Sequence, residues 1–242
     1  MILLSLKMGV WRMTPDLETW TPRQLLTTGP LTGRFVSVAP TDPERDAAAL
    51  FAATSAGDPR LWDYLPYGPF SDEATFAAWL RTHVDDSSLL PRTIVDNETG
   101  LPVGNASFMG IDQDNGEIEI GHIFFSPTLQ RTRAATEAIY LMIRHAFDDL
   151  GYRRLVWKCD ANNARSMRAA ERFGYQHEGI WRQHRIVKGR NRDTAWFSII
   201  DGEWPKVKAA FEEWLDDANI DGDGRQVRSL GEVREGSAKE WK

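Results

Sequence analysis

Residues 124–138 read FFSPTLQRTRAATEA, and this stretch says more about the fold than any other part of the chain. An apolar strand that ends at Phe125 enters a short loop, and the loop opens a long helix. The loop amides and the free N–H groups at the start of such a helix make a natural anion site. Arg131 and Arg133 add positive charge there. The stretch therefore predicts a phosphate-binding turn, with a solvated strand-to-helix connection as the alternative.

Strands and helices alternate on both sides of this stretch. Gly151 and Gly174 each follow a run with helical spacing, where a left-handed glycine ends a helix. The predicted strands lie at 34–38, 92–96, 103–110, 117–125, 154–159, 175–187 and 194–201, and the predicted helices at 43–54, 71–83, 135–150, 164–173 and 204–217. This order indicates an α+β (mixed α/β) fold with a mixed sheet.

The chain of 242 residues fits one domain with an extension at each end. Residues 1–30 contain three prolines that break any long helix, so we expect an N-terminal arm that lies on the domain. We expect the domain itself over residues 31–217. Residues 218–242 are polar and glycine-rich with few groups to bury, which predicts a mobile C-terminal tail.

The composition limits the binding partners and the cellular compartment that we expect for this protein. A formal net charge of −6 gives no general attraction to nucleic acid or to an anionic membrane. Cys159 is the one cysteine, so no intramolecular disulfide can form, which suits a reducing compartment. The apolar start at 1–10 is too short for a membrane span and lacks the arrangement of a secretory signal. We expect a cytoplasmic protein without nucleic-acid or membrane partners, and without a metal, since Cys159 and the scattered histidines make no zinc pattern.

Within the opening stretch, QRTRAA at 130–135 resembles the pyrophosphate loop of GNAT-superfamily N-acetyltransferases, Gln/Arg-x-x-Gly-x-Gly/Ala. The longer run QRTRAATEA is similar to their RimJ/RimL-like branch. Arg133 stands in place of the central glycine, which keeps an amide and gains a charge but changes the conformations open to the loop. The resemblance runs from Leu31 to Trp214. It implies the GNAT acyl-CoA N-acyltransferase fold, a mostly antiparallel sheet, splayed in the middle and flanked by helices.

The same resemblance implies acetyl-CoA (CoA) as co-substrate and assigns residues to bind it. The pantetheine arm would enter the splay and pair with the backbone of Phe124, Phe125 and Ser126. The pyrophosphate would lie on the loop and helix start formed by Gln130, Arg131, Thr132, Arg133, Ala134, Ala135 and Thr136.

A second segment, DANNARSMRAAERFGY at 160–175, resembles the family pattern Asn-x-x-Ser followed by a helix and Gly-Phe/Tyr. Asn163 and Ser166 are three residues apart, so on a helix they face the same side. The resemblance implies that Asn163 contacts the pantetheine arm and that Ser166 hydrogen-bonds the departing thiol. The alternative is that Asn162 or Asn163 caps the helix and Ser166 is merely exposed.

The strand at 117–125 carries the candidate bases. Its run Glu119-Ile-Gly-His122 is similar to Glu-Ile-Gly-Tyr of RimJ/RimL-like sequences. Regular alternation would put Glu119 and His122 on opposite faces. An amine must lose a proton before or during attack, and a carboxylate or imidazole near the acetyl group could accept it. Glu119 is our first choice and His122 the second, against the alternative that Glu119 pairs with an arginine and His122 packs in the sheet.

A third segment, WRQHRIVKGRNRDTAWFS at 181–198, resembles the RimJ/RimL-like ending, in which a hairpin leads into an aromatic strand. Arg182, His184 and Arg185 could face an acidic substrate or form a basic surface in solvent. The expected substrate pocket lies between residues 62–71, the strand at Glu119 and the hairpin at Arg182.

Together these features predict an N-acetyltransferase that moves the acetyl group of acetyl-CoA to a primary amine, on a protein N-terminus or a small molecule. Transfer would be direct, in a ternary complex, with no covalent enzyme intermediate. Two alternatives stay open, a non-catalytic acyl-CoA-binding sensor and a self-resistance acetyltransferase that acts on an antibiotic or toxin. The sequence fixes neither the acceptor nor the choice between monomer and homodimer.

Overall fold

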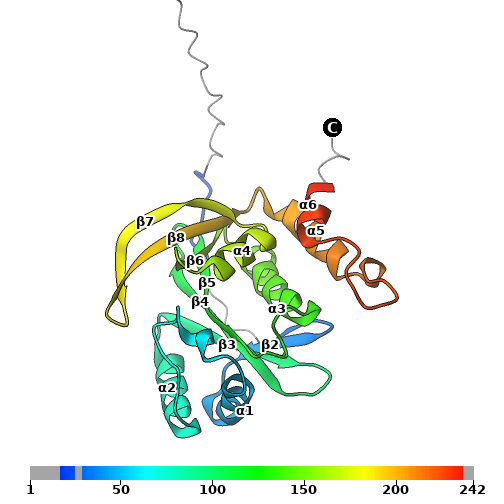
Figure 1. The fold of residues 1–242 in the computed structure, drawn as a ribbon. Coiled ribbons are helices and arrows are strands. Elements are labelled where there is room, and N and C mark those ends of the chain that lie inside the picture. Colours follow the sequence, from blue (N-terminus) through cyan, green and yellow to red (C-terminus); the bar gives the residue numbers. More distant parts are fainter. Residues whose placement is uncertain (1–16, 25–28, 237–242) are drawn as a thin grey trace, which may run out of the picture.

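The computed structural model describes residues 17–24 and 29–236, and within them a twisted sheet forms the centre of the molecule (Figure 1). The strands are Leu31–Thr32 (β1), Val36–Pro40 (β2), Leu89–Asp96 (β3), Pro102–Asp112 (β4), Glu117–Phe125 (β5), Arg154–Asp160 (β6), Gln176–Val187 (β7) and Arg190–Ile200 (β8). They lie in the order β1-β2-β3-β4-β5-β6-β8-β7. Only β5 and β6 are parallel among these described neighbours. The predicted mixed, mostly antiparallel sheet is confirmed.

Helices cover both faces of the sheet (Figure 1). One face carries α1 (Pro43–Ser55), η1 (Pro59–Trp62) and α2 (Glu73–Asp85), which share a hydrophobic core around Leu50, Phe76 and Leu80. The other face carries a larger core that includes Ile139 and Phe211. The helices on that side are α3 (Arg133–Arg144), η2 (His145–Asp149), α4 (Ala164–Phe173), α5 (Trp204–Leu215), η3 (Asp217–Asn219) and α6 (Leu230–Gly236).

The two middle strands, β5 and β6, separate along their length. Their paired residues are Glu117–Glu119 and Arg154–Val156. Beyond these pairs, β5 stays bonded to β4 as far as Phe125, and β6 stays bonded to β8 as far as Asp160. No further β5–β6 pair occurs among the described residues, so the inner edges of both strands keep N–H and C=O groups that need another partner. The predicted splay is therefore confirmed.

A bulge interrupts β5 at His122. Gly121 lies opposite Ser107 and Phe124 lies opposite Asn105, so β5 has one residue more than β4 between these pairs. The backbone of His122 has a φ of 52°, a left-handed conformation that is uncommon outside glycine. The regular alternation of side chains along β5 is broken at this point.

The bulge brings Glu119 and His122 to the same side of the sheet. Before it, Ile118 and Ile120 pack in the core under α3, so Glu119 faces the side of α1 and α2. After it, Phe124 packs under α1 and α2, and the His122 ring lies against a side chain of α2. The prediction of opposite faces for Glu119 and His122 was wrong, because it assumed a strand without an extra residue.

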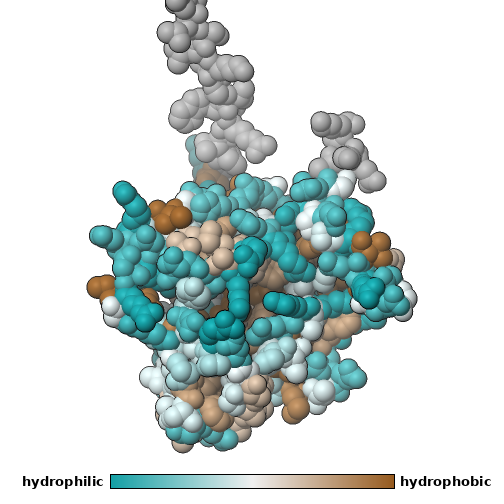
Figure 2. Space-filling model, viewed as in Figure 1, coloured by the Kyte–Doolittle hydropathy of each residue, from teal (hydrophilic) through white to brown (hydrophobic). Residues whose placement is uncertain are grey.

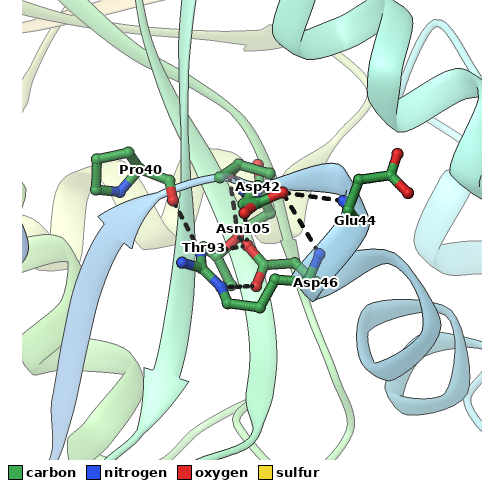
Figure 3. Close-up of polar contacts among 8 residues, drawn as sticks. Pro40, Asp42, Glu44, Asp46, Thr93 and Asn105 are labelled. Atoms are coloured by element: carbon green, nitrogen blue, oxygen red, sulfur yellow. Dashed lines mark hydrogen bonds and ion pairs between the residues drawn. The ribbon is translucent and has the colours of Figure 1, made fainter.

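A buried polar cluster fixes the start of α1 to the sheet (Figure 3). Asp42 caps the helix by accepting from the backbone N–H groups of Glu44 and Arg45. The fully buried Asp46 accepts from the Thr93 hydroxyl of β3 at 2.6 Å and from the Arg45 guanidinium at 2.6 Å. These contacts set where α1, and the connection from α1 to α2, lie over the sheet.

A buried carboxylate ties α3 to the first two strands. Glu137 is 6% exposed and accepts from the backbone N–H groups of Arg34, Phe35 and Val36 at 2.8, 2.6 and 2.9 Å. One side chain of α3 therefore satisfies three amides of the turn from β1 to β2. This contact holds in place the helix whose start follows the loop at 126–132.

Glu137→Ala is expected to lower the free energy of unfolding by roughly 3 kcal/mol, because three backbone amides, that of Val36 buried, lose a charged acceptor. Urea-induced unfolding followed by tryptophan fluorescence measures the loss. Glu98→Ala, at an exposed turn, is the matched control and should change the same quantity by less than about 0.5 kcal/mol. A loss for Glu137→Ala no larger than the control's would show that water replaces the carboxylate.

The observed elements follow the predicted ones closely, and the strand at 117–125 and the helix at 164–173 coincide with their predictions. The predicted helix at 135–150 starts two residues earlier and becomes π-helical at His145. The short elements β1, η1 and α6 were not predicted. Their sequences are too brief to show a hydrophobic period.

Parts of both terminal segments are described, and both contact the domain. At the N-terminal end, Trp20 and Arg23 donate to backbone carbonyls of Asp114 and Gly151 at 2.7 and 2.8 Å. Residues 218–236 include α6, in which Leu230 and Val233 are 1% and 0% exposed against the core. Few residues of this segment are buried, but two apolar residues three apart are enough to anchor a short helix, which the polar composition did not predict. The rest of the predicted arm and tail, at 1–16, 25–28 and 237–242, lies outside the described residues.

Candidate functional site

The connection from β5 to α3 is a tight turn whose polar side chains bond to its own backbone. Ser126 is buried and accepts from the backbone N–H three residues on at 3.2 Å. Gln130 donates through its side chain to the carbonyl of Phe125 at 2.8 Å. Arg131 has a φ of 65°, so it is the left-handed residue of the turn. The unusual conformation thus falls on Arg131, two positions before the Arg133 that replaces the family's glycine.

The start of α3 presents unpaired backbone donors. Thr132 caps the helix, and its hydroxyl oxygen accepts from the N–H of Ala135 at 3.1 Å. The N–H groups of Arg133 and Ala134 are the first two of the helix and have no partner inside it. Ala135 and Thr136 are buried, which brings the helix end close against the sheet. The positive end of the helix dipole and these amides can therefore bind an anion.

The side chain of Arg133 turns away from this turn. Its Nη1 lies 3.0 Å from a carboxylate oxygen of Asp217, and its other terminal nitrogen donates to the carbonyl of Leu215. The guanidinium carbon also lies 4.7 Å from the centre of the Phe35 ring. The charge that the sequence predicted for the loop is therefore already paired at the end of α5. The exposed Arg131 is the remaining arginine of the turn.

The backbone at the end of β5 is partly committed to other partners. The N–H of Ser126 donates to the carbonyl of Val103 at 2.9 Å, and the carbonyl of Phe125 already accepts from Gln130. The Phe124 side chain fills the core under α1 and α2. The predicted pairing of a pantetheine arm with Ser126 is therefore at odds with the structure, because that amide belongs to the sheet.

The start of α4 brings Asn163 and Ser166 together, as their spacing predicts. Asn163 caps the helix, and its side-chain oxygen accepts from the N–H of Ser166 at 3.1 Å. The Ser166 oxygen accepts from the indole N–H of Trp157 at 2.9 Å, so this side chain is turned toward β6. Burial raises the pKa of Cys159, and a hydrogen bond from Ser166 opposes that rise. Capping, which the sequence left as the alternative for Asn163, is what the structure shows, whereas Ser166 has a defined partner.

Glu119 is buried beside a cation. Its carboxylate lies 2.8 Å from the Lys158 ammonium, which in turn sits 4.1 Å from the centre of the Trp196 ring. Burial raises the pKa of Glu119, and the charge of Lys158 counteracts it. The alternative of an ion pair is therefore what the structure shows, with a lysine of β6 in place of an arginine.

His122 lies in an aromatic group with residues from the α1–α2 connection and from α2. Its Nδ1 is 3.1 Å from the hydroxyl of Tyr67, and its ring centre is 4.9 Å from that of His83. Trp79 contacts the other two rings: its centre lies 4.3 Å from that of Tyr67 in a tilted arrangement and 5.0 Å from that of His83 in a stacked one. Burial lowers the pKa of His122. Local patterns in the sequence do not indicate that Tyr67, His83 or Lys158 contacts β5, although Tyr67 lies in the segment 62–71 expected to form the substrate pocket.

The connection from α1 to α2 spans the ends of the splayed strands. The Tyr64 hydroxyl donates to the carbonyl of Asn162, just before α4, at 3.0 Å. Lys188, at the turn between β7 and β8, donates to the carbonyl of Trp62 at 2.8 Å. Three segments that the sequence placed around the substrate therefore lie together.

The β7–β8 hairpin presents both charged and apolar groups. Arg182 and Arg185 are exposed, whereas His184 bonds through Nδ1 to the Thr194 hydroxyl at 3.0 Å. Ile180 and Ile186 are exposed too, and apolar patches appear at this hairpin in Figure 2. Of the three residues predicted for a basic surface, the two arginines are exposed, and Lys188 and Arg190 of the same hairpin are exposed with them.

Two kinds of feature are missing from the part of the chain that the structure describes. None of its helices combines the length and apolar character needed to cross a bilayer. Its His, Cys, Asp and Glu side chains form no group of three or more that could hold a metal ion.

Comparisons with known proteins agree with this geometry. The acetyltransferase (GNAT) domain family matches residues 37–176, more than half of the chain. The crystal structure of a GCN5-related N-acetyltransferase from Brucella melitensis is similar at a TM-score of 0.88 and 43% identity, over 90% of this chain and 100% of that one. The uncharacterized N-acetyltransferase p20 of Bacillus licheniformis is 29% identical over 155 residues, 61% of this chain and 84% of p20. The microcin C7 self-immunity acetyltransferase MccE, solved with acetyl-CoA and AMP, shares the fold at a TM-score of 0.61 and 20% identity, over 69% of this chain and 93% of its own. The chain therefore belongs to the GNAT acetyltransferase family, as its RimJ/RimL-like sequence features predicted.

Proposed function

We propose that the protein transfers the acetyl group of acetyl-CoA to a primary amine at the point where β5 and β6 separate. The observation that carries the proposal is the splay, whose open strand edges lie next to a helix start with free amides. An extended chain with amide groups and a pyrophosphate at one end has the matching chemistry. Membership of the GNAT family, and a protein of the same fold solved with acetyl-CoA, support this choice of co-substrate.

Among the described residues, one set would bind the pyrophosphate of acetyl-CoA and another would bind its pantetheine arm. The amides of Arg133 and Ala134, with the exposed guanidinium of Arg131, are placed to receive the pyrophosphate. The pantetheine amides would pair with the open edge of β5 before Ser126, at Phe124 and Phe125, where the Phe125 carbonyl would have to exchange Gln130 for the ligand. Asn163 retains its side-chain NH₂ for the same arm, because the cap uses only its oxygen.

The proposed chemistry is direct transfer. The amine nitrogen attacks the thioester carbon, loses a proton to a base, and the carbon–sulfur bond breaks. Glu119 and His122 both face the side of α1 and α2, so either could face an amine that enters from there. Ser166 accepts from Trp157 and hydrogen-bonds Cys159, so its O–H would turn from Cys159 to donate to the thiolate that forms.

Arg131→Ala is expected to weaken CoA binding several-fold at low salt and less at high salt, since exposed charges are screened by ions. Isothermal titration calorimetry at two salt concentrations measures this. Arg133→Ala is the matched control, and it should lower thermal stability more than affinity because its side chain is bound to Asp217. An equal loss of affinity in Arg131→Ala for acetyl-pantetheine, which has no pyrophosphate, would contradict the assignment.

The experiment that tests the proposed function is release of free thiol from acetyl-CoA with a panel of primary amines, combined with mass spectrometry of the amines. Acetylated amine and an equal amount of CoA are the expected products. CoA binding by calorimetry without thiol release from any amine would instead establish an acyl-CoA-binding sensor. Neither binding nor release would remove the proposal altogether.

A further inference from the structure

The bulge residue His122 is held on both sides by side chains from other elements. Its left-handed backbone turns the imidazole away from the strand, and such conformations persist where the surroundings enforce them, often at functional sites. Tyr67 meets Nδ1 at 3.1 Å with its ring nearly parallel to the imidazole, at 12°. His83 lies edge-on to the same ring and is itself fixed by Ser107 of β4, 3.3 Å from its Nε2.

We propose that Tyr67 and His83 are positioning residues that hold His122 as the base of the reaction. The inference rests on the proposed function and assigns its proton acceptor. The Nδ1–Tyr67 contact is open to either direction of donation, and the proposal assigns Nδ1–H as the donor to the Tyr67 oxygen, which puts the lone pair for the amine on Nε2. The tyrosine holds the orientation of the imidazole ring, as a carboxylate or carbonyl does beside other catalytic histidines.

The proton balance of the step is simple. The attacking amine nitrogen forms the C–N bond and gives its proton to Nε2 of His122, while the C–S bond breaks and its electron pair goes to sulfur. In the imidazolium that results, Nδ1–H donates to the Tyr67 oxygen. The thiolate takes a proton from water, directly or through Ser166, which recovers its own proton from water in the same step, and His122 returns its proton to solvent. One amine and one thioester thus become one amide and one thiol.

The surroundings keep the imidazole neutral and ready to accept. Burial lowers the pKa of His122, with Asp86, just after α2, opposing the shift and Arg192 of β8 adding to it. Burial, and then the proximity of His122, lower the pKa of His83 to about 4. Burial raises the pKa of Tyr67, which stays protonated. At neutral pH the His122 imidazole is therefore uncharged, and in the proposed tautomer its basic nitrogen is Nε2, on the side of the ring away from Tyr67.

Glu119 is the weaker choice for this role on geometric grounds. Its carboxylate is paired with Lys158 at 2.8 Å, and proton transfer to it would leave the lysine buried without its partner. His122 has no such partner to lose, because the Tyr67 hydroxyl can accept from Nδ1 after the proton arrives. Glu119 instead holds Lys158 in place on the same side of the sheet.

The first test is Tyr67→Phe, which keeps the ring against Trp79 and removes only the hydroxyl. We expect kcat/KM to fall about tenfold, the size of a lost hydrogen bond to a group that becomes charged. Nuclear magnetic resonance of the labelled imidazole should show a lower pKa for His122, because the imidazolium loses its acceptor. Tyr140→Phe is the control, since it removes a hydroxyl bonded to Glu212 at 2.8 Å on the other face of the sheet. It should leave both quantities unchanged.

The second test concerns His83. His83→Ala should lower kcat/KM by about the same factor, and His83→Phe should restore most of it, because a ring is needed to back the imidazole. An unchanged titration of His122 in Tyr67→Phe would overturn the proposal whatever the activity, since the resonance measurement needs no turnover. Unchanged rates in both Tyr67→Phe and His83→Ala would overturn it as well. Absence of thiol release from the wild type would instead contradict the proposed function.

Discussion

His122→Ala is expected to lower kcat by about 100- to 10,000-fold, the range for loss of a positioned general base, with little change in CoA affinity. The affinity should persist because His122 faces α2, whereas the proposed pyrophosphate site lies at the start of α3. Steady-state kinetics with the best amine of the panel, and calorimetry with CoA, measure the two quantities.

The dependence of kcat/KM on pH tests most directly whether His122 is the base. Burial places the pKa of His122 below its ordinary value of 6.5, so the imidazole is free to accept a proton at neutral pH. As the pH falls through that lowered pKa, His122 becomes protonated and kcat/KM should fall with it. A weakly basic amine must be used as acceptor, so that its own ionisation does not hide the effect. In His122→Ala this acid-side fall should disappear. Wild-type rates in His122→Ala, with a loss in Glu119→Gln, would transfer the role to Glu119.

Ser166→Ala is expected to lower kcat by about 10- to 1,000-fold, the scale for removal of one donor to a charge that develops in the transition state. CoA affinity should stay nearly constant, because sulfur carries that charge only while the C–S bond breaks. The indole of Trp157 holds the Ser166 oxygen at 2.9 Å, and the hydroxyl proton can still rotate toward the sulfur. Single-turnover kinetics separate this step from product release.

Ser55→Ala is the control for that variant, since Ser55 ends α1 and its hydroxyl bonds only to the backbone of the same helix. It should keep the wild-type rate. If Ser166→Ala raised KM for acetyl-CoA and left kcat unchanged, Ser166 would be a binding residue and not a donor to the leaving group.

Much of the fold followed from local patterns. The strand at 117–125 and the helix at 164–173 have uninterrupted periods and clear end signals, and both were predicted to the residue. The bulge at His122 was not predicted, because a left-handed non-glycine residue inside an apolar strand leaves no mark in the sequence. That single extra residue decides that Glu119 and His122 share a side.

The candidate site was predictable only where one segment forms it. The turn at 126–132 and the cap at Asn163 depend on neighbours in the sequence, and both were identified. The partners of the candidate bases come from far away in the chain: Tyr67 is 55 residues from His122. For Arg133 the sequence predicted a free charge at the loop. Its side chain instead pairs with Asp217, 84 residues away in the chain, and neighbouring residues in the sequence do not reveal such a partner.

Hydrogen–deuterium exchange with and without CoA tests the central claim most directly, that the ligand lies between β5 and β6 against the start of α3. Peptides that cover residues 117–125 and 130–136 are expected to gain protection in the presence of CoA, because the open edge of β5 and the amides of Arg133 and Ala134 acquire acceptors. Peptides of β1, β2 and α5 should exchange as before. Protection confined to other segments, with 117–125 and 130–136 unchanged under saturating CoA, would contradict it.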